Sequence, residues 1–240
     1  MTGEMLLIEL WEDRLRGITE LVREMGINHI ISRPYLGNVI AVEEFRPSGI
    51  IISGGTPNIS EIEKYPFLRT TISLTQKAVE EGIPVLGICL GHQVLATAIG
   101  GTVRKALNPE VGFYEVRHHA EGIMENAQNP LTVFQYHFDE VAGLPASAKI
   151  LAFNSNSEIQ AFSTADGKSF GVQFHPEISL EKGISIISGR RKILEGAGFN
   201  VPKMLEIGRI SYKETQSLGV LKSYLRTVSV DLQRDKKKGG

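Results

Sequence analysis

The sequence has one cysteine, no excess of charge of either sign and no long apolar run. A single Cys among 240 residues excludes an intrachain disulfide, which fits a reducing compartment. The 26 basic and 27 acidic side chains leave a formal charge of -1, so no overall field would attract nucleic acid or an anionic membrane. No apolar run reaches membrane-spanning length, and no signal peptide is recognisable. We therefore expect a cytoplasmic protein that binds neither nucleic acid nor membranes.

The first half of the sequence alternates short apolar segments with helical periodicity. Three consecutive Ile residues at 50–52 indicate a strand that is buried on both faces, as in a parallel sheet. The expected strands are 5–10, 28–32, 47–53 and 83–88, and the expected helices are 14–25, 67–81 and 91–99. This alternation predicts an α/β fold with a largely parallel central sheet flanked by helices.

The second half has a different pattern. Short β-like segments at 111–117, 132–138, 150–154, 158–163 and 169–175 are followed by helical periodicity at 184–194 and 203–228. The β-like segments predict an added antiparallel β layer. Because an apolar helix face is usually buried within its own domain, we expect 203–228 to pack on the core rather than to serve as a docking surface.

Cys89 lies where a predicted buried strand passes into a helix. With Gly87 and Gly91 it forms Gly-Ile-Cys-Leu-Gly, the spacing of a nucleophile elbow with Cys in place of Ser. A helix that begins just after the thiol favours the thiolate through its N-terminal dipole. The alternative is a buried structural Cys that behaves as a small hydrophobic side chain. The elbow alone does not decide between the two.

A second motif, Gly-Val-Gln-Phe-His-Pro-Glu over 171–177, ends another predicted strand. Side chains two residues apart on an extended chain point the same way, so Glu177 can accept the Nδ1 proton of His175 while Nε2 faces a nucleophile. A strand-end His with a chance acidic neighbour would be the default interpretation without an elbow. Together the two motifs predict a triad of Cys89, His175 and Glu177.

A Gly-Gly turn, Gly54 and Gly55, follows the Ile-rich strand. Loops at the carboxyl ends of neighbouring parallel strands share one crevice, so this turn can approach Cys89. The backbone N–H groups of Gly55 and Leu90 are then candidates for an oxyanion hole. The simpler alternative is a tight loop. No Gly-Lys-Ser/Thr follows, so a Walker-type phosphate loop is excluded.

Taken together, the three motifs resemble those of the class I, triad-type glutamine amidotransferases. The resemblance implies a flavodoxin-like fold with Cys89 as nucleophile, His175 as general base and acid, and Glu177 as its orienting partner. It also implies that Gly55 and Leu90 are the oxyanion donors. The glutamine contacts implied by the family are Gly54, Gln93, and Tyr136 and His137 in the segment 135–141, which is similar to the family loop that holds the α-carboxylate.

Within the family, the segments 110–116, 135–141 and 150–156 are most similar to the glutaminase unit of GMP synthetase. Two positions depart from that pattern. Thr56 precedes Pro57 in the oxyanion turn, where the family usually has Gly-Gly-Pro, and Phe138 stands where GMP synthetases usually carry Gly. Both changes concern glutamine positioning and coupling to a partner more than the hydrolytic chemistry.

The implied activity is hydrolysis of L-glutamine to glutamate and ammonia through a thioester on Cys89. No ATP-binding motif is present, so we expect the ammonia to pass to a separate ATP-dependent synthetase chain, with GMP synthetase as the candidate. No cofactor and no metal are expected. Two alternatives stay open: an autonomous γ-glutamyl hydrolase or amidase, and a catalytically weak regulatory protein on the same scaffold.

The expected organisation has three parts. Residues 1–180 form the glutamine amidotransferase catalytic domain, 181–232 a C-terminal helical extension packed on the same domain, and 233–240 a flexible tail.

Overall fold

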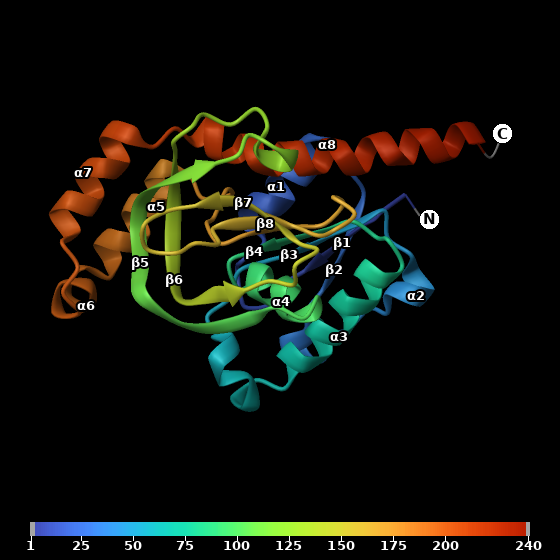
Figure 1. Ribbon diagram of the computed structural model, residues 1–240, viewed down its shortest axis with the longest axis horizontal. Helices are drawn as coiled ribbons and strands as arrows, with labels where there is room; N and C mark the ends of the chain where they lie inside the picture. Colours follow the sequence, from blue (N-terminus) through green and yellow to red (C-terminus); the bar gives the residue numbers. More distant parts are fainter. Residues whose placement is uncertain (1–2, 239–240) are drawn as a thin grey trace.

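The computed structural model describes the backbone of residues 3–238 and the side chains of residues 3–228. Within this part of the chain the strands form one nine-stranded sheet (Figure 1). The strands are β1 Met5–Ile8, β2 His29–Ser32, β3 Gly49–Ile52, β4 Val85–Ile88, β5 Thr102–His118, β6 Leu131–Gly143, β7 Lys149–Phe153, β8 Ala161–Ser163 and β9 Phe170–Val172. Their order in the sheet is β2-β1-β3-β4-β9-β8-β7-β5-β6.

The first five strands in this order are parallel and form the doubly wound, flavodoxin-like half of the sheet. All four predicted strands of the first half are present. The Ile residues at 50–52 are fully buried, as expected for a strand with helices on both of its faces. The predicted α/β fold is therefore confirmed.

The predicted antiparallel strands continue the same sheet beyond β9. β8 pairs antiparallel with β9, and β5 with β6 makes a long hairpin at the edge, visible as the large curved pair in Figure 1. The segment 135–141, similar to a family loop, is part of β6. It is extended because it pairs with β5, with His137 opposite Glu110 and Tyr136 opposite Val111.

Helices cover both faces of the parallel half. The helices are α1 Arg16–Glu24, α2 Val42–Phe45, α3 Phe67–Glu80, α4 Leu90–Ala98, α5 Leu180–Gly189, α6 Arg191–Gly196, α7 Val201–Ser211 and α8 Glu214–Lys238, with short 3-10 turns at Pro34–Leu36, Ile59–Lys64 and Gly122–Met124. α1 and α8 share a hydrophobic core on one face of the sheet, whereas α3 and α4 cover the other (Figure 1). α5, α6 and α7 pack against the β5–β6 hairpin.

The C-terminal helices differ from the predicted ones in their boundaries. The expected helix 184–194 is two helices that meet at Arg190, and the expected segment 203–228 is broken at Tyr212. Tyr212 is extended because its hydroxyl donates to the carbonyl oxygen of Ile178 at 2.5 Å and its ring packs against Phe113. The sequence predicted that 203–228 packs on the core. The α8 residues Leu221 and Leu225 do so, since both are fully buried.

Two further observations concern the C-terminal region. Ile210, one of the apolar residues of 203–228, is 74% exposed because it lies on the outer side of α7. The backbone of 233–238 continues α8 as a helix, residues 239–240 lie outside the described residues, and the flexibility expected for 233–240 stays a prediction. Whether 1–180 and 181–232 act as the predicted units stays a prediction.

α8 is anchored at the amino ends of the parallel strands. The Tyr224 hydroxyl lies 2.8 Å from the carbonyl oxygen of Ile50 and 2.9 Å from that of Pro84. Burial raises the pKa of this phenol, so it remains a neutral hydrogen-bonding group. The candidate site lies at the opposite, carboxyl ends of the same strands. Among the described residues, no helix is both long enough and apolar enough to span a bilayer.

Candidate active site

Cys89 occupies a strained turn between β4 and α4. Its φ is 53° and its ψ is -104°, a conformation that L-residues rarely adopt and that marks a nucleophile elbow. An added Cβ at Gly87 would lie 2.2 Å from the carbonyl oxygen of Gly91, and one at Gly91 would lie 2.2 Å from that of Ile52. Only glycine fits at either position, because β4, the start of α4 and the end of β3 approach one another closely here. These backbone contacts hold the turn that carries Cys89.

His175 and Glu177, expected at a strand end, lie in the turn that follows β9. Nδ1 of His175 and Oε1 of Glu177 are 2.8 Å apart, with the side chains 12% and 6% exposed. The His175 backbone N–H also donates to the carbonyl oxygen of Phe134 at 2.9 Å. The predicted pairing of the imidazole and the carboxylate is thus present, and a backbone bond to β6 fixes its position.

The imidazole of His175 also interacts with the Cys89 thiol. Burial acts to lower the pKa of His175, but the charges of Glu177 and Cys89 and hydrogen bonds to both side chains raise it to about 10. The protonated imidazole is therefore favoured over the usual range of pH.

The Gly-Gly turn packs directly against these groups. An added Cβ at Gly54 would lie 2.8 Å from Cε1 of His175 and 3.5 Å from Cβ of Cys89. One at Gly55 would lie 2.6 Å from Cδ2 of Leu90. The structure thus brings Gly54, Gly55 and Leu90 together around the thiol, as expected from the sequence.

Arg14, which no sequence motif indicated, supports the Gly-Gly turn. Its Nη2 donates to the hydroxyl of Thr56 at 3.3 Å. Thr56, the departure from the family pattern, therefore has a partner that Pro at this position would lack. The Ser53 hydroxyl adds a second restraint, since it donates to the carbonyl oxygen of Gly54 at 2.8 Å and accepts from the backbone N–H of Leu10.

β6 presents two different faces because side chains alternate along a strand. Phe134, Tyr136 and Phe138 line the cleft that contains Cys89, and the Tyr136 carbonyl oxygen lies 3.8 Å from Sγ of Cys89. Phe138, the second departure, is 43% exposed and packs edge-on against the Tyr136 ring. Phe134, Tyr136 and Phe138 together form an aromatic wall of the cleft, and Phe138 is its exposed end.

The other face of β6 is polar and buried. Nε2 of His137 is 3.1 Å from Oε2 of Glu110, and its Nδ1 is 2.9 Å from the Asp139 carbonyl oxygen. Oε1 of Glu110 accepts from Nδ2 of Asn154 at 2.6 Å and from Nδ2 of Asn156 at 3.2 Å. His137 therefore belongs to a buried hydrogen-bond network under the cleft wall, although its residue also borders the cleft.

Glu110 is fully buried and central to this network. Burial alone would raise the pKa of its carboxyl group, but hydrogen bonds from His137, Asn154 and Gln160 and the charge of His137 lower it. The sequence motifs gave Glu110 no role of its own. A signal was present nevertheless, because Glu110 begins the segment 110–116 that is similar to the family pattern.

Gln93 lies on the first turn of α4 and lines the cleft. Its Nε2 donates to the carbonyl oxygen of Asp139 at 3.0 Å and to Oε1 of Gln173 at 3.2 Å. The side-chain nitrogen is therefore committed to the protein, and a contact with substrate would use the oxygen.

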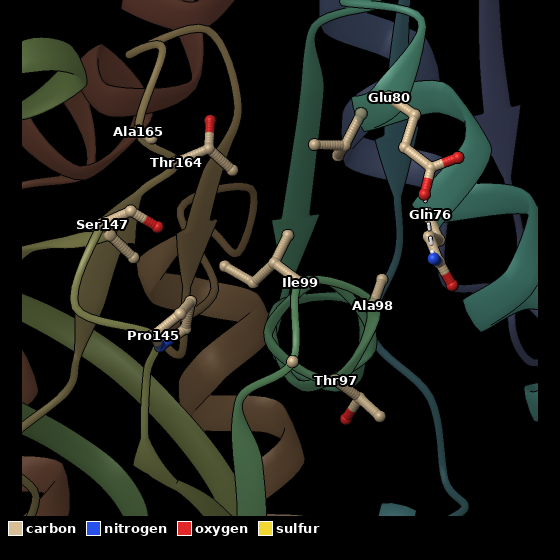
Figure 2. A pocket seen from close by; sticks show the side chains of 12 residues that line it. Gln76, Glu80, Thr97, Ala98, Ile99, Pro145, Ser147, Thr164 and Ala165 are labelled. Atoms are coloured by element: carbon tan, nitrogen blue, oxygen red, sulfur yellow. Dashed lines mark hydrogen bonds between the residues drawn. The ribbon is translucent and has the colours of Figure 1, made fainter.

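Cys89, His175, Glu177, the Gly-Gly turn, Gln93 and residues 136–138 of β6 border one cleft of about 1060 Å³ at the carboxyl ends of β1, β3, β4 and β9. Ligands bind at this edge in doubly wound sheets. A second hollow of about 560 Å³ lies between α3, the end of α4 and the loops around Pro145 and Thr164 (Figure 2). Among the described residues that line it, Glu80 is the one titratable side chain, so it offers no nucleophile with a base.

The structure thus combines a doubly wound sheet with a cysteine elbow and an adjacent His-Glu pair, all at the carboxyl ends of its parallel strands. The family model of glutamine amidotransferase class-I matches residues 14–188. The chain therefore belongs to the class I glutamine amidotransferases, as the sequence motifs predicted.

Individual relatives agree with this assignment. A subunit of the glutamine-hydrolysing GMP synthase of Saccharolobus solfataricus is 38% identical over 172 residues, which cover 66% of this chain and 88% of that protein. The glutamine-hydrolysing GMP synthase of Thiobacillus denitrificans is 31% identical over 224 residues, 88% of this chain and 42% of that protein. A solved glutamine amidotransferase from Thermotoga maritima has a TM-score of 0.79 and 26% identity, and covers 95% of this chain and 99% of its own.

Proposed function

We propose that this chain hydrolyses L-glutamine to glutamate and ammonia with Cys89, His175 and Glu177 as a catalytic triad. The observation that carries the proposal is the 2.8 Å pair of His175 and Glu177, with the His175 ring and Cys89 both packed against Gly54 in one cleft. This arrangement supplies a nucleophile, a neighbouring base and a carboxylate that orients the base.

The first half of the reaction forms a thioester. The Cys89 thiolate attacks the side-chain carbonyl carbon of glutamine, and the C–O electron pair moves onto oxygen. Backbone N–H groups of Gly55 and Leu90 stabilise this oxyanion. As the intermediate collapses, the C–N bond breaks and the protonated imidazole of His175 gives its proton to the departing nitrogen, so that ammonia leaves.

The second half releases glutamate. His175, now neutral, accepts a proton from water as the water oxygen attacks the thioester carbonyl. The C–S bond then breaks and the Cys89 thiolate returns beside the protonated imidazole. Glu177 orients the imidazole throughout, while Gly54, Gln93, Tyr136 and His137 hold the substrate. No cofactor or metal is required by these steps.

We further propose that the ammonia passes to a separate ATP-dependent synthetase in the cytoplasm. Support comes from relatives that are named as one subunit of a glutamine-hydrolysing GMP synthase, which implies that a further subunit exists. An enzyme of the GMP synthetase type is therefore the proposed acceptor partner. In this proposal, residues 1–180 carry the chemistry and 181–232 complete the domain around the cleft.

The test measures glutamate and ammonia released from L-glutamine by the purified chain, with and without a GMP synthetase partner chain, ATP and its acceptor. Cys89→Ser should reduce turnover by several orders of magnitude while thermal unfolding stays unchanged. A glutamine analogue with a diazoketone in place of the amide should add its mass to Cys89 in the wild-type chain and not in Cys89→Ser.

The outcomes separate the alternatives. Turnover that rises when the synthetase is added supports the ammonia-transfer proposal. High turnover that no synthetase changes would assign the chain to the autonomous γ-glutamyl hydrolases. Absence of both turnover and labelling, with and without the synthetase, would refute the triad and leave a regulatory protein.

A further inference from the structure

Arg190 is placed on the cleft by the break between α5 and α6. Its side chain lines the same cleft as Cys89 and His175, although it comes from the C-terminal helices. Nη1 donates to the Tyr136 hydroxyl at 2.7 Å, and Cζ lies 5.2 Å from the centroid of the Tyr136 ring. This hydrogen bond and the cation–π contact orient the guanidinium over the aromatic wall.

The charge of Arg190 has no acidic partner among the described residues. Its neighbour Arg191 differs, because Nε of Arg191 is 2.8 Å from Oε1 of Glu195. Of the two other arginines that line the cleft, Arg16 pairs with Glu20, whereas Arg14 donates to the Thr56 hydroxyl and so belongs to the Gly-Gly turn. A guanidinium has five N–H donors, and the Tyr136 hydroxyl accepts from one nitrogen only. Arg190 is therefore equipped to bind a carboxylate.

Tyr136 connects this cation with the nucleophile. Its carbonyl oxygen is 3.8 Å from Sγ of Cys89, and its hydroxyl accepts from Arg190. In glutamine the attacked carbon and the α-carboxylate carbon are four bonds apart, roughly 5 Å in an extended molecule. A glutamine that lies along the Tyr136 side chain with its amide at Cys89 thus directs its α-carboxylate toward Arg190.

We propose that Arg190 binds the α-carboxylate of the γ-glutamyl substrate and so determines specificity for donors that carry this group. The proposal rests on the function proposed above. It assigns to the C-terminal helices a direct part in substrate recognition, beyond the contacts that the family resemblance implies for 135–141. Arg190 acts in binding and takes no part in the bond-breaking steps.

The experiment compares Arg190→Gln with Arg191→Gln, a matched change at the adjacent, salt-bridged residue. Hydrolysis of L-glutamine is measured for both, together with inhibition by glutaramate, which keeps the carboxylate and lacks the α-amine, and by 4-aminobutanamide, which lacks the carboxylate. Arg190→Gln should raise the KM for glutamine and the inhibition constant of glutaramate by about 10- to 100-fold, as for the loss of a hydrogen bond to a charged group. It should leave kcat and inhibition by 4-aminobutanamide within about threefold of wild type.

A second variant separates binding from folding. Arg190→Lys keeps the charge but not the planar fork, so it should recover part of the lost affinity for glutamine. Arg191→Gln should match wild type in every measurement. An equal loss for glutaramate and 4-aminobutanamide, or an unchanged KM in Arg190→Gln, would overturn the assignment. A wild-type chain without glutamine turnover or diazoketone labelling would instead refute the proposed function itself.

Discussion

The cysteine elbow and the segment 135–139 of β6 face the same cleft but are held in place by different means. At the elbow, Gly87 and Gly91 allow backbone segments to approach so closely that an added Cβ would lie 2.2 Å from a carbonyl oxygen. In β6, buried side chains hold the strand, with Glu110 bound to His137 and Asp139 bound to Ser60. The stability of the elbow should therefore depend on side-chain volume at its glycines, whereas the stability of β6 should depend on the charge and hydrogen bonds of its buried side chains.

This difference has a chemical basis. A nucleophile must be aimed to within a fraction of an ångström, and backbone contacts provide that rigidity without mobile side chains. In the proposed mechanism β6 contacts the substrate, and a satisfied buried polar network keeps its backbone in a fixed position. The His175–Glu177 pair combines both, because a backbone bond to Phe134 and a side-chain bond hold the imidazole.

The largest loss of activity is expected from a substitution in the His175–Glu177 pair. Glu177→Gln should lower kcat by roughly 10³- to 10⁴-fold with little change in the KM for glutamine, because the amide neither orients nor stabilises the imidazolium as the carboxylate does. Glu20→Gln, a change to an exposed carboxylate that borders the same cleft, is the control and should be near wild type. Steady-state kinetics decide the matter, and equal effects of the two substitutions would mean that the pair is structural.

The pH dependence of the same variant sharpens this result. Protonation of the leaving nitrogen needs the imidazolium of His175, which exists below its pKa, so activity should fall as the pH rises through about 10 in wild type. The charge of Glu177 raises that pKa, so the alkaline limb of kcat in Glu177→Gln should move to lower pH. An alkaline limb at the same pH in both proteins would contradict this assignment.

Volume sensitivity at the elbow predicts the next effect. Gly91→Ala should destabilise the protein by about 3 kcal/mol, because the new methyl group meets the backbone of Ile52, which cannot yield as a side chain would. Gly219→Ala is the matched control, since no atom lies within 4 Å of its added Cβ and the residue is helical. There the change should stabilise by about 0.5 to 1 kcal/mol. Urea unfolding compares them, and similar stabilities would refute backbone enforcement of the turn.

Charge sensitivity in β6 predicts a smaller change. Glu110→Gln should cost about 1 to 3 kcal/mol at neutral pH. An amide has one acceptor oxygen, and its nitrogen would face either Asn154 and Asn156 or His137 and Gln160. The pKa of Glu110 is lowered on folding, so the stabilisation by its carboxylate is present above the unfolded pKa of about 4.3 and is lost as the pH falls through the lower folded value.

The difference in unfolding free energy between wild type and Glu110→Gln should therefore narrow below about pH 4. Glu115→Gln on the exposed side of β5 is the control and should change stability by less than about 0.5 kcal/mol. A difference for Glu110→Gln that is independent of pH would show that the lost interaction does not depend on the carboxylate charge.

The sequence alone determined the elements whose signals are local. The Ile run of β3, the Gly-Ile-Cys-Leu-Gly elbow and the His-Pro-Glu spacing each depend on residues close together in the chain, and they were sufficient to predict the parallel sheet and the candidate triad. Strand periodicity and glycine spacing express steric rules that act within a few residues.

Only the tertiary structure decided how distant residues meet. Nothing local marks Glu110 as the partner of His137, Arg14 as the support of Thr56, or Arg190 as a neighbour of Tyr136. The extended form of 139–143 and the break at Tyr212 depend likewise on β5 and on the Ile178 carbonyl. Pairing across the sheet and burial of polar groups depend on which segments pack together, a property of the folded chain as a whole.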